Sequence, residues 1–237
     1  MRLSVGTSGY SYKAWKGPFY PEKLPARAML EHYASRLPSV EINNTFYRMP
    51  REEVVAGWAD AVPATFRFAV KASRRITHLK RLADVQEPLD YMIRATGRLG
   101  ERLGVTLFQL PPYMKKDRAR LADFLALIPQ GARAAMEFRH DSWFDHEIYD
   151  VLHERGVALC ASDTDAGEHA GPLATASFGY LRLRRPDYDD RALETWVSRV
   201  LAQDWEEAFV YFKHEDEAAG PKMALRFLEI ARGKGPS

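Results

Sequence analysis

The chain has 237 residues, of which 46% are hydrophobic, 28% charged and 12% aromatic. This composition is typical of a folded domain and excludes collagen-like, coiled-coil and disordered chains. Thirty-four lysines and arginines against 32 acidic residues leave a formal net charge of +2, too small to indicate nucleic-acid binding by itself.

Short runs with strand character alternate along the chain with helical patterns. The eight predicted strands are Leu3–Thr7, Ser39–Asn43, Phe66–Lys71, Val105–Leu110, Ala134–Arg139, Val157–Asp163, Phe178–Arg184 and Ala208–Lys213. The predicted helices are Arg27–Arg36, Arg51–Ala61, Leu89–Leu103, Arg118–Ile128, His146–Arg155, Arg191–Gln203 and one near Pro221–Ala231. Between the sixth and seventh strands, Gly167, Gly171 and Pro172 interrupt the pattern, so we expect a loop with at most a short helical turn over Thr164–Ala176.

This alternation predicts parallel strands that are joined by crossover helices. Eight such units in a chain of this length predict a single α/β domain over residues 1–237, a (β/α)8 TIM-type barrel whose sixth helix is short or missing. A doubly wound open sheet is the alternative. However, the turn after the first strand, Gly6-Thr7-Ser8-Gly9-Tyr10, matches neither a dinucleotide-binding loop nor a P-loop.

The sequence carries no signal for secretion or membrane insertion. No stretch approaches the roughly 18 uncharged apolar residues that a membrane span needs. The amino terminus runs directly into a strand pattern without a secretory hydrophobic region. Cys160 is the single cysteine, so no intrachain disulfide can form. We therefore expect a cytoplasmic protein without a membrane partner, and the oligomeric state stays open.

The alternation of side chains along each strand predicts which polar residues point into the barrel. In Met136-Glu137-Phe138-Arg139 the two apolar side chains face the helices, so Glu137 and Arg139 face the interior. The same alternation predicts an interior polar set from seven strands, mostly at their carboxyl ends: Glu41, Asn43, Lys71, Gln109, Glu137, Arg139, Asp163, Arg182, Arg184, Tyr211 and Lys213.

This polar interior is unusual, because barrels of this type are normally filled by Val, Ile and Leu and have their active sites at the carboxyl ends of the strands. Burying one unpaired charge costs several kcal/mol. The interior cations outnumber the carboxylates, which favours an anionic ligand held by arginines and leaves the carboxylates for acid–base chemistry. The alternative is a paired salt-bridge network that only supports the fold.

The histidines are a weaker indication of a site. His78, His140, His169 and His214 all follow strands, and with Glu137 and Asp163 they could ligate a divalent metal. No compact ligand motif is present, so solvated or capping histidines are the default. No cofactor is predicted, and a divalent metal is the minor alternative.

Aromatic residues crowd the first loop and recur near other strand ends. They would stack a sugar or a base, or close the barrel mouth as an apolar plug, and the sequence favours neither. The residues concerned are Tyr10, Tyr12, Trp15, Phe19, Tyr20, Phe46, Tyr47, Trp143 and Tyr211.

Taken together, several motifs resemble the YecE-like family, also known as domain of unknown function 72. They are Gly6-Thr7-Ser8-Gly9-Tyr10, Trp15, Phe19-Tyr20-Pro21, Val40-Glu41-Ile42-Asn43-Asn44-Thr45-Phe46-Tyr47, Val70-Lys71-Ala72-Ser73-Arg74, Ile76-Thr77-His78, Gln109-Leu110-Pro111-Pro112, and Glu137-Phe138-Arg139-His140 with Trp143. The resemblance runs in order over essentially the whole chain. It implies a TIM-type barrel, leaves the reaction open, and covers the candidate residues Glu41, Lys71, His78, Gln109, Glu137 and Arg139.

The last two strands depart from the family pattern. Where the family's seventh strand tends to end in Arg-x-His-Gly, this chain has Arg182-Leu183-Arg184-Arg185. Where the eighth tends to end in Phe-Asn-Asn, it has Phe212-Lys213-His214. Both changes introduce stronger cations, which indicates a more anionic ligand.

We therefore predict an enzyme that uses acid–base chemistry on a small phosphorylated or carboxylated, sugar-like substrate. Lys71, Arg139 and Arg182 would hold the anion, while Glu41 and Glu137 would exchange protons. The predicted catalytic residues are Glu41, Lys71, His78, Glu137 and Asp163, and the predicted substrate-binding residues are Tyr10, Asn43, Gln109, Arg139, Arg182, Tyr211 and Lys213. The alternatives are metal-dependent nucleic-acid processing of the endonuclease IV type, by analogy of fold alone, and a non-catalytic anion-binding protein.

Overall fold

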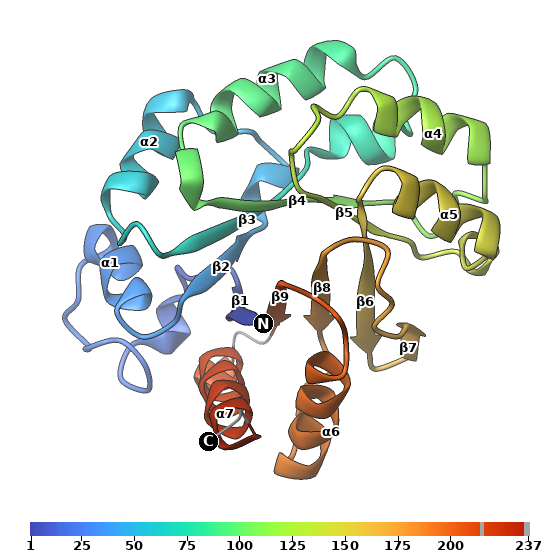
Figure 1. Cartoon of the computed structure of the whole chain (residues 1–237). Helices are drawn as coiled ribbons and strands as arrows, with labels where there is room; N and C mark the ends of the chain where they lie inside the picture. The colour runs from blue at the N-terminus through green and yellow to red at the C-terminus, as the bar shows by residue number, and fades with distance from the viewer. Residues whose placement is uncertain (214–215, 235–237) are drawn as a thin grey trace.

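The short apolar runs form eight parallel strands that close into a barrel in the computed structural model, which describes residues 1–213 and 216–234 (Figure 1). The strands are β1 (Arg2–Ser8), β2 (Ser39–Ile42), β3 (Arg67–Lys71), β4 (Leu103–Gln109), β5 (Ala134–Glu137), β6 (Ala158–Thr164), β8 (Phe178–Leu183) and β9 (Glu207–Phe212). Neighbours pair in this order around the ring, with β5 paired to β6 and β9 paired to β1. The predicted TIM-type barrel is confirmed.

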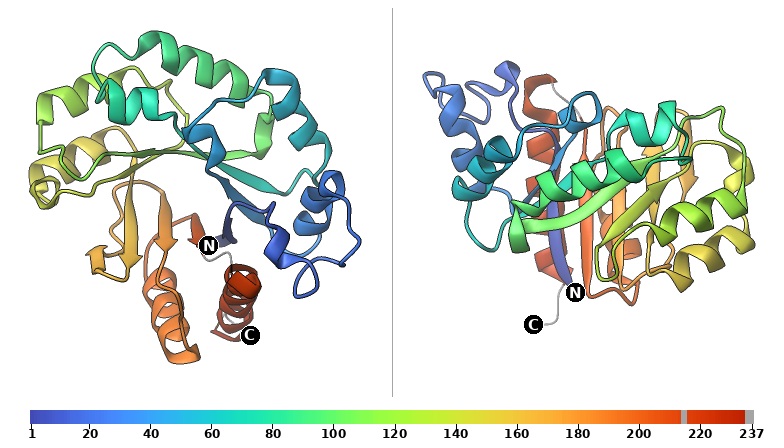
Figure 2. Two further views of the ribbon diagram at one scale, coloured as in Figure 1. Left: turned by 180° about the vertical axis from the view of Figure 1, so that it is seen from behind. Right: turned by 90° about the horizontal axis from the view of Figure 1, so that it is seen from above.

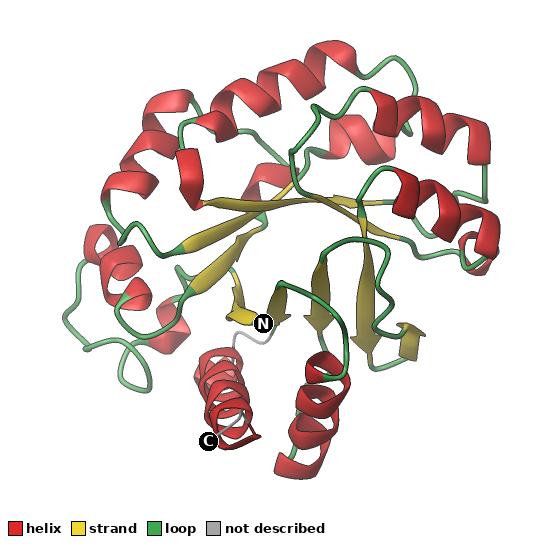
Figure 3. Ribbon diagram, viewed as in Figure 1, coloured by secondary structure: helices red, strands yellow, loops and turns green. Residues whose placement is uncertain are grey.

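The helices lie outside the ring of strands (Figures 2 and 3). They are α1 (Met29–Ala34), α2 (Glu52–Asp60), α3 (Gln86–Gly97), α4 (Arg118–Ala126), α5 (His146–Glu154), α6 (Asp190–Leu201) and α7 (Ala219–Lys234). Aspartate side chains cap the amino ends of α4, α5 and α6, namely Asp117, Asp145 and Asp189. Each cap satisfies a backbone N–H that would otherwise lack a partner.

Two connections differ from the sequence-based expectation. The helix predicted over Leu89–Leu103 ends earlier, at Gly97, and β4 already begins at Leu103. Between β6 and β8, where every residue is described, no helix occurs, as predicted. The expected loop is instead a hairpin in which β7 (Gly167–Ala170) pairs antiparallel with β6. Gly167 allows this tight turn because its φ of +105° lies in the left-handed region, which other residues rarely adopt.

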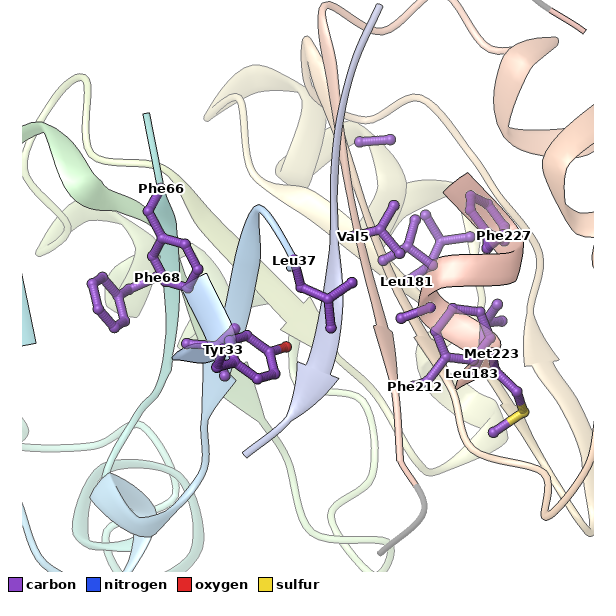
Figure 4. Close-up of a cluster of buried hydrophobic side chains, with 14 of the residues drawn as sticks. Val5, Tyr33, Leu37, Phe66, Phe68, Leu181, Leu183, Phe212, Met223 and Phe227 are labelled. Carbon is purple, nitrogen blue, oxygen red and sulfur yellow. The ribbon is translucent and has the colours of Figure 1, made fainter. Parts of the chain in front are cut away.

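Apolar side chains fill both the interior of the barrel and the layer between strands and helices. Phe209, Tyr180 and Cys160 are among the buried residues inside the ring. On the outer face, Leu183 and Phe212 point toward α7 (Figure 4). The interior packing makes the lower barrel a solid core, so a ligand can enter only at an end.

Within the described residues, no helix has the length and apolarity needed to cross a membrane. His214, one of the candidate metal ligands, lies outside the described residues.

Candidate functional site

The strand register brings most of the predicted polar set together at the carboxyl end of the barrel. Glu41 on β2, Glu137 on β5 and Arg182 on β8 point inward and are at most 2% exposed. The side chains of Asn43, Lys71, Gln109, Arg139, Arg184 and Lys213 surround them at the mouth. The predicted orientation of these nine residues is therefore confirmed.

Arg182 joins the two buried glutamates. Its Nη1 donates to Glu137 Oε2 at 2.6 Å, and its Nη2 donates to Glu41 Oε1 at 3.0 Å. Its Nε lies 3.0 Å from Glu41 Oε2. One guanidinium thus connects strands β2, β5 and β8 across the barrel.

Further hydrogen bonds saturate both carboxylates. Glu41 accepts from Ser8 Oγ at 2.6 Å, from Tyr180 OH at 2.7 Å and from Asn43 Nδ2 at 2.9 Å. Each of these donors stabilises the ionised form of the carboxyl group. Burial alone would raise the pKa of Glu41, but Arg182 and these donors outweigh it, so the pKa lies below its usual value.

Glu137 is held in the same ionised state. It accepts from Gln109 Nε2 at 2.7 Å and from Arg139 Nε at 3.2 Å, and Arg184 Nη1 lies 4.0 Å away. Burial opposes ionisation, yet Arg182, Arg139 and Arg184 together lower the pKa of Glu137 to about 2. A group that stays ionised near neutral pH is a poor general acid, and a weak conjugate base accepts protons poorly.

An open cavity of about 610 Å³ lies above this network. Its volume is within the range of small-molecule sites. Among the described residues, six cationic side chains line it and no acidic one does: Lys71, Arg74, Arg139, Arg182, Arg184 and Lys213. With the two glutamates underneath, these eight side chains carry a formal surplus of four positive charges. The cavity is therefore suited to an anion.

Lys71 lies at the end of β3, in the wall of this cavity. Thr45 Oγ1 donates to the Lys71 carbonyl at 2.7 Å and thereby fixes the segment η3 (Asn44–Phe46) beside the strand end. As a result, Lys71 Nζ lies 4.2 Å from the centre of the Phe46 ring. Burial and the neighbouring Arg182 lower the pKa of Lys71 to about 8, although Glu137 and Glu41 partly oppose this.

His78 faces the same cavity from the π-helical segment η4 (Arg75–Leu79). Its ring meets the Phe46 ring edge to face, with 4.8 Å between the ring centres, and its Nδ1 lies 2.9 Å from Thr77 Oγ1. Burial and the nearby Lys71 lower the pKa of His78, so the neutral imidazole is favoured. Isolated π-helical turns are often found at functional sites.

A second cavity of about 550 Å³ adjoins the first on the side of the β6–β7 hairpin. Arg139, Arg184 and Lys213 line both cavities, and His169 lines the second one alone. These three cations lie on the ridge between the two spaces. An anion on that ridge would leave room for substituents on either side.

The prediction that Asp163 points into the barrel is wrong. On β6, Ala158, Cys160 and Ser162 face the interior, and Asp163 faces outward. Its carboxylate accepts from Tyr188 OH at 2.9 Å and lies 2.9 Å from Arg185 Nε. The residues of this strand are apolar on both faces, so alternation could not reveal its orientation.

Two predicted substrate-binding tyrosines lie outside the main cavity. Tyr211 does point inward, but it is fully buried, and its hydroxyl hydrogen-bonds Ser39 Oγ at 2.6 Å below the mouth. Tyr10 lines a separate small cavity and packs near Tyr33. His140 caps a short helical turn by accepting from the Ser142 N–H, as the capping interpretation predicted.

The aromatic residues lie in two different places. Trp15, Tyr20 and Trp143 are buried in the hydrophobic clusters of the outer core. Tyr12, Phe46 and Tyr47 line the cavity instead.

Several site residues escaped the sequence analysis. Ser8 and Tyr180 bond Glu41, and both could have been found by extending the alternation along β1 and β8. Arg74 and Tyr113 reach the cavity from loops, where no periodic pattern predicts a direction. Gly9 has a φ of +91° in the turn after Ser8, and a Cβ there would lie 2.3 Å from the Tyr12 hydroxyl. The glycine therefore allows Tyr12 to fold back toward the cavity.

The described residues contain no group of three or more His, Cys, Asp or Glu side chains arranged to hold a metal ion. The candidate ligands of the sequence analysis are dispersed instead. Glu137 is bound by arginines, Asp163 faces outward and His140 acts as a cap.

Replacing Lys71 by methionine should stabilise the protein by about 1–3 kcal/mol at pH 7, because a partly buried ammonium is exchanged for an apolar chain of similar length. The unfolded chain binds more protons than the folded one between pH 8 and 10.5, so this penalty is present below pH 8 and is lost as the pH rises through that window. Urea unfolding at pH 7 and pH 10 measures the free energy of unfolding of Lys71→Met, of the wild type and of the control variant at the exposed Lys23, Lys23→Met. Equal changes in this free energy in both variants would contradict the expectation.

Comparison with known proteins places this chain in a family. The profile described as "Protein of unknown function DUF72" matches residues 4–236. The UPF0759 protein YunF of Bacillus subtilis is 30% identical over 254 aligned residues, which cover 89% of this chain and 90% of that protein. The UPF0759 protein YecE of Escherichia coli K12 is 29% identical over 62% of this chain and 56% of its own length.

Solved structures show the same architecture. A DUF72 family protein from Thermotoga maritima is 27% identical to this chain and superposes with a TM-score of 0.85. The alignment covers 98% of this chain and 100% of the Thermotoga protein. A D-psicose 3-epimerase from Clostridium cellulolyticum, solved with D-tagatose, has a TM-score of 0.62 at 10% identity over 98% of this chain and 99% of its own, and shares the fold alone.

Proposed function

This chain belongs to the DUF72 family, and we propose that it is an enzyme that binds a small anionic substrate at the carboxyl ends of the barrel strands. The substrate bears a phosphate or a carboxylate, on a sugar-like or similarly small body. Lys71 and His78 carry out the acid–base chemistry. Arg139, Arg184 and Lys213 hold the anion.

The observation that carries this proposal is the uneven charge of the cavity. Arg182 forms ion pairs with both Glu41 and Glu137, so these three buried side chains already compensate one another's charges in part. The other cationic side chains lie above these three in an open space, among them Arg139, which is 30% exposed, and Arg184, which is 20% exposed. Guanidinium groups in a partly desolvated site bind phosphate or carboxylate through charge-assisted hydrogen bonds. A fold alone would not require this surplus.

The division of roles among the titrating groups follows from their pKa shifts. The pKa of Glu137 is lowered to about 2, and that of Glu41 is also lowered, so neither changes charge near neutral pH. Lys71, with a pKa of about 8, and His78, with a lowered pKa, are the cavity groups that exchange protons more readily. We therefore assign the glutamates to the positioning of Arg182 and Arg139 instead of the proposed proton transfer.

Exposed apolar side chains at the rim indicate the other part of the substrate. Tyr47 is 73%, Tyr113 65% and Leu79 60% exposed, and all three line the main cavity. Such apolar surfaces beside a cationic site favour a substrate whose body packs against the rim while its anionic group lies on the cations. The rim thus supports a small sugar-like body for the substrate.

Inorganic phosphate should raise the melting temperature of the protein, and Arg139→Ala and Arg184→Ala should each weaken this effect. The loss of a charge-assisted contact costs about 1.5–3 kcal/mol, which corresponds to phosphate binding weaker by roughly 10–150-fold. Thermal shift and calorimetric titration measure both quantities, each variant being compared with its own ligand-free state.

Arg27→Ala is the matched control, because Arg27 is an exposed arginine of the short turn η2 (Ala26–Ala28), outside the cavity. It removes the same charge from the chain. An equal loss of phosphate binding in the control and the cavity variants would show only a non-specific charge effect. No response to phosphate, sulfate or small carboxylates in the wild-type protein would overturn the proposal.

A further inference from the structure

The Lys71 ammonium differs from the arginines around it in its bonding. Arg182 and Arg139 each lie within 3.2 Å of a glutamate oxygen. Across the described residues, Lys71 Nζ makes no hydrogen bond or salt bridge, and its close neighbour is the face of Phe46. A cation in a solvent-accessible cavity without a carboxylate partner is not held there by the fold's ion-pair network.

The same surroundings favour the neutral amine. The positive charges of Arg182 and Arg139 and the partial burial of the side chain disfavour a further cation at this position. With a pKa of about 8, about one Lys71 in ten is uncharged at pH 7, whereas an ordinary lysine is almost entirely protonated. Amines become nucleophiles when desolvation or neighbouring cations lower their pKa in this way.

The geometry points to Lys71 as a nucleophile that forms an imine with a carbonyl carbon of the substrate, while the substrate's anionic group lies on Arg139 and Arg184. This inference rests on the proposed function and specifies its substrate class. The substrate is an aldehyde or ketone that also bears a phosphate or carboxylate, such as a 2-oxo acid or an open-chain sugar phosphate.

The step is balanced without an external oxidant or reductant. The Lys71 Nζ lone pair forms a C–N bond to the carbonyl carbon, and a proton moves from nitrogen to the former carbonyl oxygen. The C–O bond then breaks as the C=N bond forms, the departing hydroxyl takes the second proton of the nitrogen, and one water molecule leaves. His78 lines the same cavity and contacts the same Phe46 ring, so it is placed to pass these protons.

Lys71 is the lysine of this cavity that is suited to the role. Lys213 also lines the cavity, but its side chain is exposed to solvent at the end of β9. The side chain of Lys71 is more buried, so Lys71 is the better candidate.

Reductive trapping tests the inference directly. The full-length protein is incubated with pyridoxal 5′-phosphate, a phosphate-bearing aldehyde used here as a probe, and in a parallel arm with glyoxylate, a carboxylate-bearing aldehyde. Borohydride then reduces any imine to a stable amine. Intact mass and peptide mapping should show one adduct, on Lys71, that forms faster as the pH rises through about 8 and that excess inorganic phosphate suppresses. A response to one probe alone identifies the anionic group.

Lys71→Arg retains the positive charge without a trappable amine, and labelling in it should fall about tenfold or more. The exposed Lys23→Arg should label like the wild-type protein. Labelling that is spread over surface lysines, or that is equal in Lys71→Arg, would overturn the inference. Phosphate binding measured in the same samples separates the two proposals. A phosphate response without Lys71 labelling rejects the imine alone, and the absence of both rejects the anion site as well.

Discussion

Replacement of Arg182 by methionine is expected to lower the free energy of unfolding by at least about 3–5 kcal/mol at pH 7, because it leaves two buried carboxylates without their common counterion. Glu41 and Glu137 are both at most 1% exposed, and Arg182 is their shared partner. In the variant, Glu41 keeps only uncharged donors such as Tyr180, whereas Glu137 keeps Arg139 beside it. Urea unfolding followed by circular dichroism measures the loss.

The pH dependence of this variant distinguishes its cause. Without Arg182, burial should raise the pKa of Glu41 most, because Glu137 keeps Arg139 and Arg184 nearby, so protonation at lower pH should remove much of the penalty. The difference in the free energy of unfolding between this variant and the wild type should therefore become smaller as the pH falls below neutral. The triple variant E41Q/E137Q/R182M removes all three charges and should recover much of the stability. A variant R182M that is as stable as the wild type at pH 7 would contradict this account of the network.

Glu137→Gln is the second substitution with a large expected effect, namely a loss of about 3 kcal/mol at pH 7. The pKa of Glu137 is lowered from 4.5 to about 2 by Arg182, Arg139 and Arg184, and a tenfold change in an acid dissociation constant is equivalent to about 1.4 kcal/mol. This stabilisation is present above pH 4.5 and is lost as the pH falls through about 2. Because glutamine cannot ionise, the variant should lack the part of the acid-dependent loss of stability that comes from protonation of Glu137.

The measurement is urea unfolding between pH 2 and pH 7. The difference in the free energy of unfolding between the wild type and Glu137→Gln should be largest at pH 7 and should decrease toward pH 2. Glu229→Gln is the control, since the Glu229 side chain is 61% exposed and lies on α7. A constant difference between the variant and the wild type over the whole range would mean that Glu137 is not stabilised as an ion.

These two predictions also bear on the two sequence-based interpretations of the interior charges. The buried trio of Glu41, Glu137 and Arg182 fits the interpretation of a network that supports the fold. Lys71 and Arg184 fit the other interpretation, because they line an open cavity above the trio. One cluster of charges can therefore contain a structural layer and a ligand-binding layer.

The sequence predicts the barrel well because the fold follows from periodic patterns. Eight apolar runs and the helices between them determine the architecture, and alternation on β5 places Glu137 and Arg139 correctly. Alternation fails on β6, where both faces are apolar and Asp163 faces outward instead of into the barrel. The hairpin at Gly167 also lies beyond the pattern, because a single glycine indicates a turn but not its type.

The chemistry is harder to predict than the fold. Counting charges indicates an anionic ligand, but the sequence cannot show that Arg182 bonds both glutamates or that Lys71 lies on Phe46. Those contacts join residues that are far apart in the chain, and they decide which groups titrate near neutral pH. The roles of Glu137 and Lys71 therefore depend on three-dimensional distances.

The most direct test of the central claim is a crystal structure of the protein grown with tungstate, an anion shaped like phosphate that can be located by its anomalous scattering. We predict a strong anomalous peak in the main cavity, within hydrogen-bond distance of Arg139 and Arg184 and beside Lys71. Peaks that occur only on the outer surface, with this cavity free of the anion at saturating tungstate, would contradict the account.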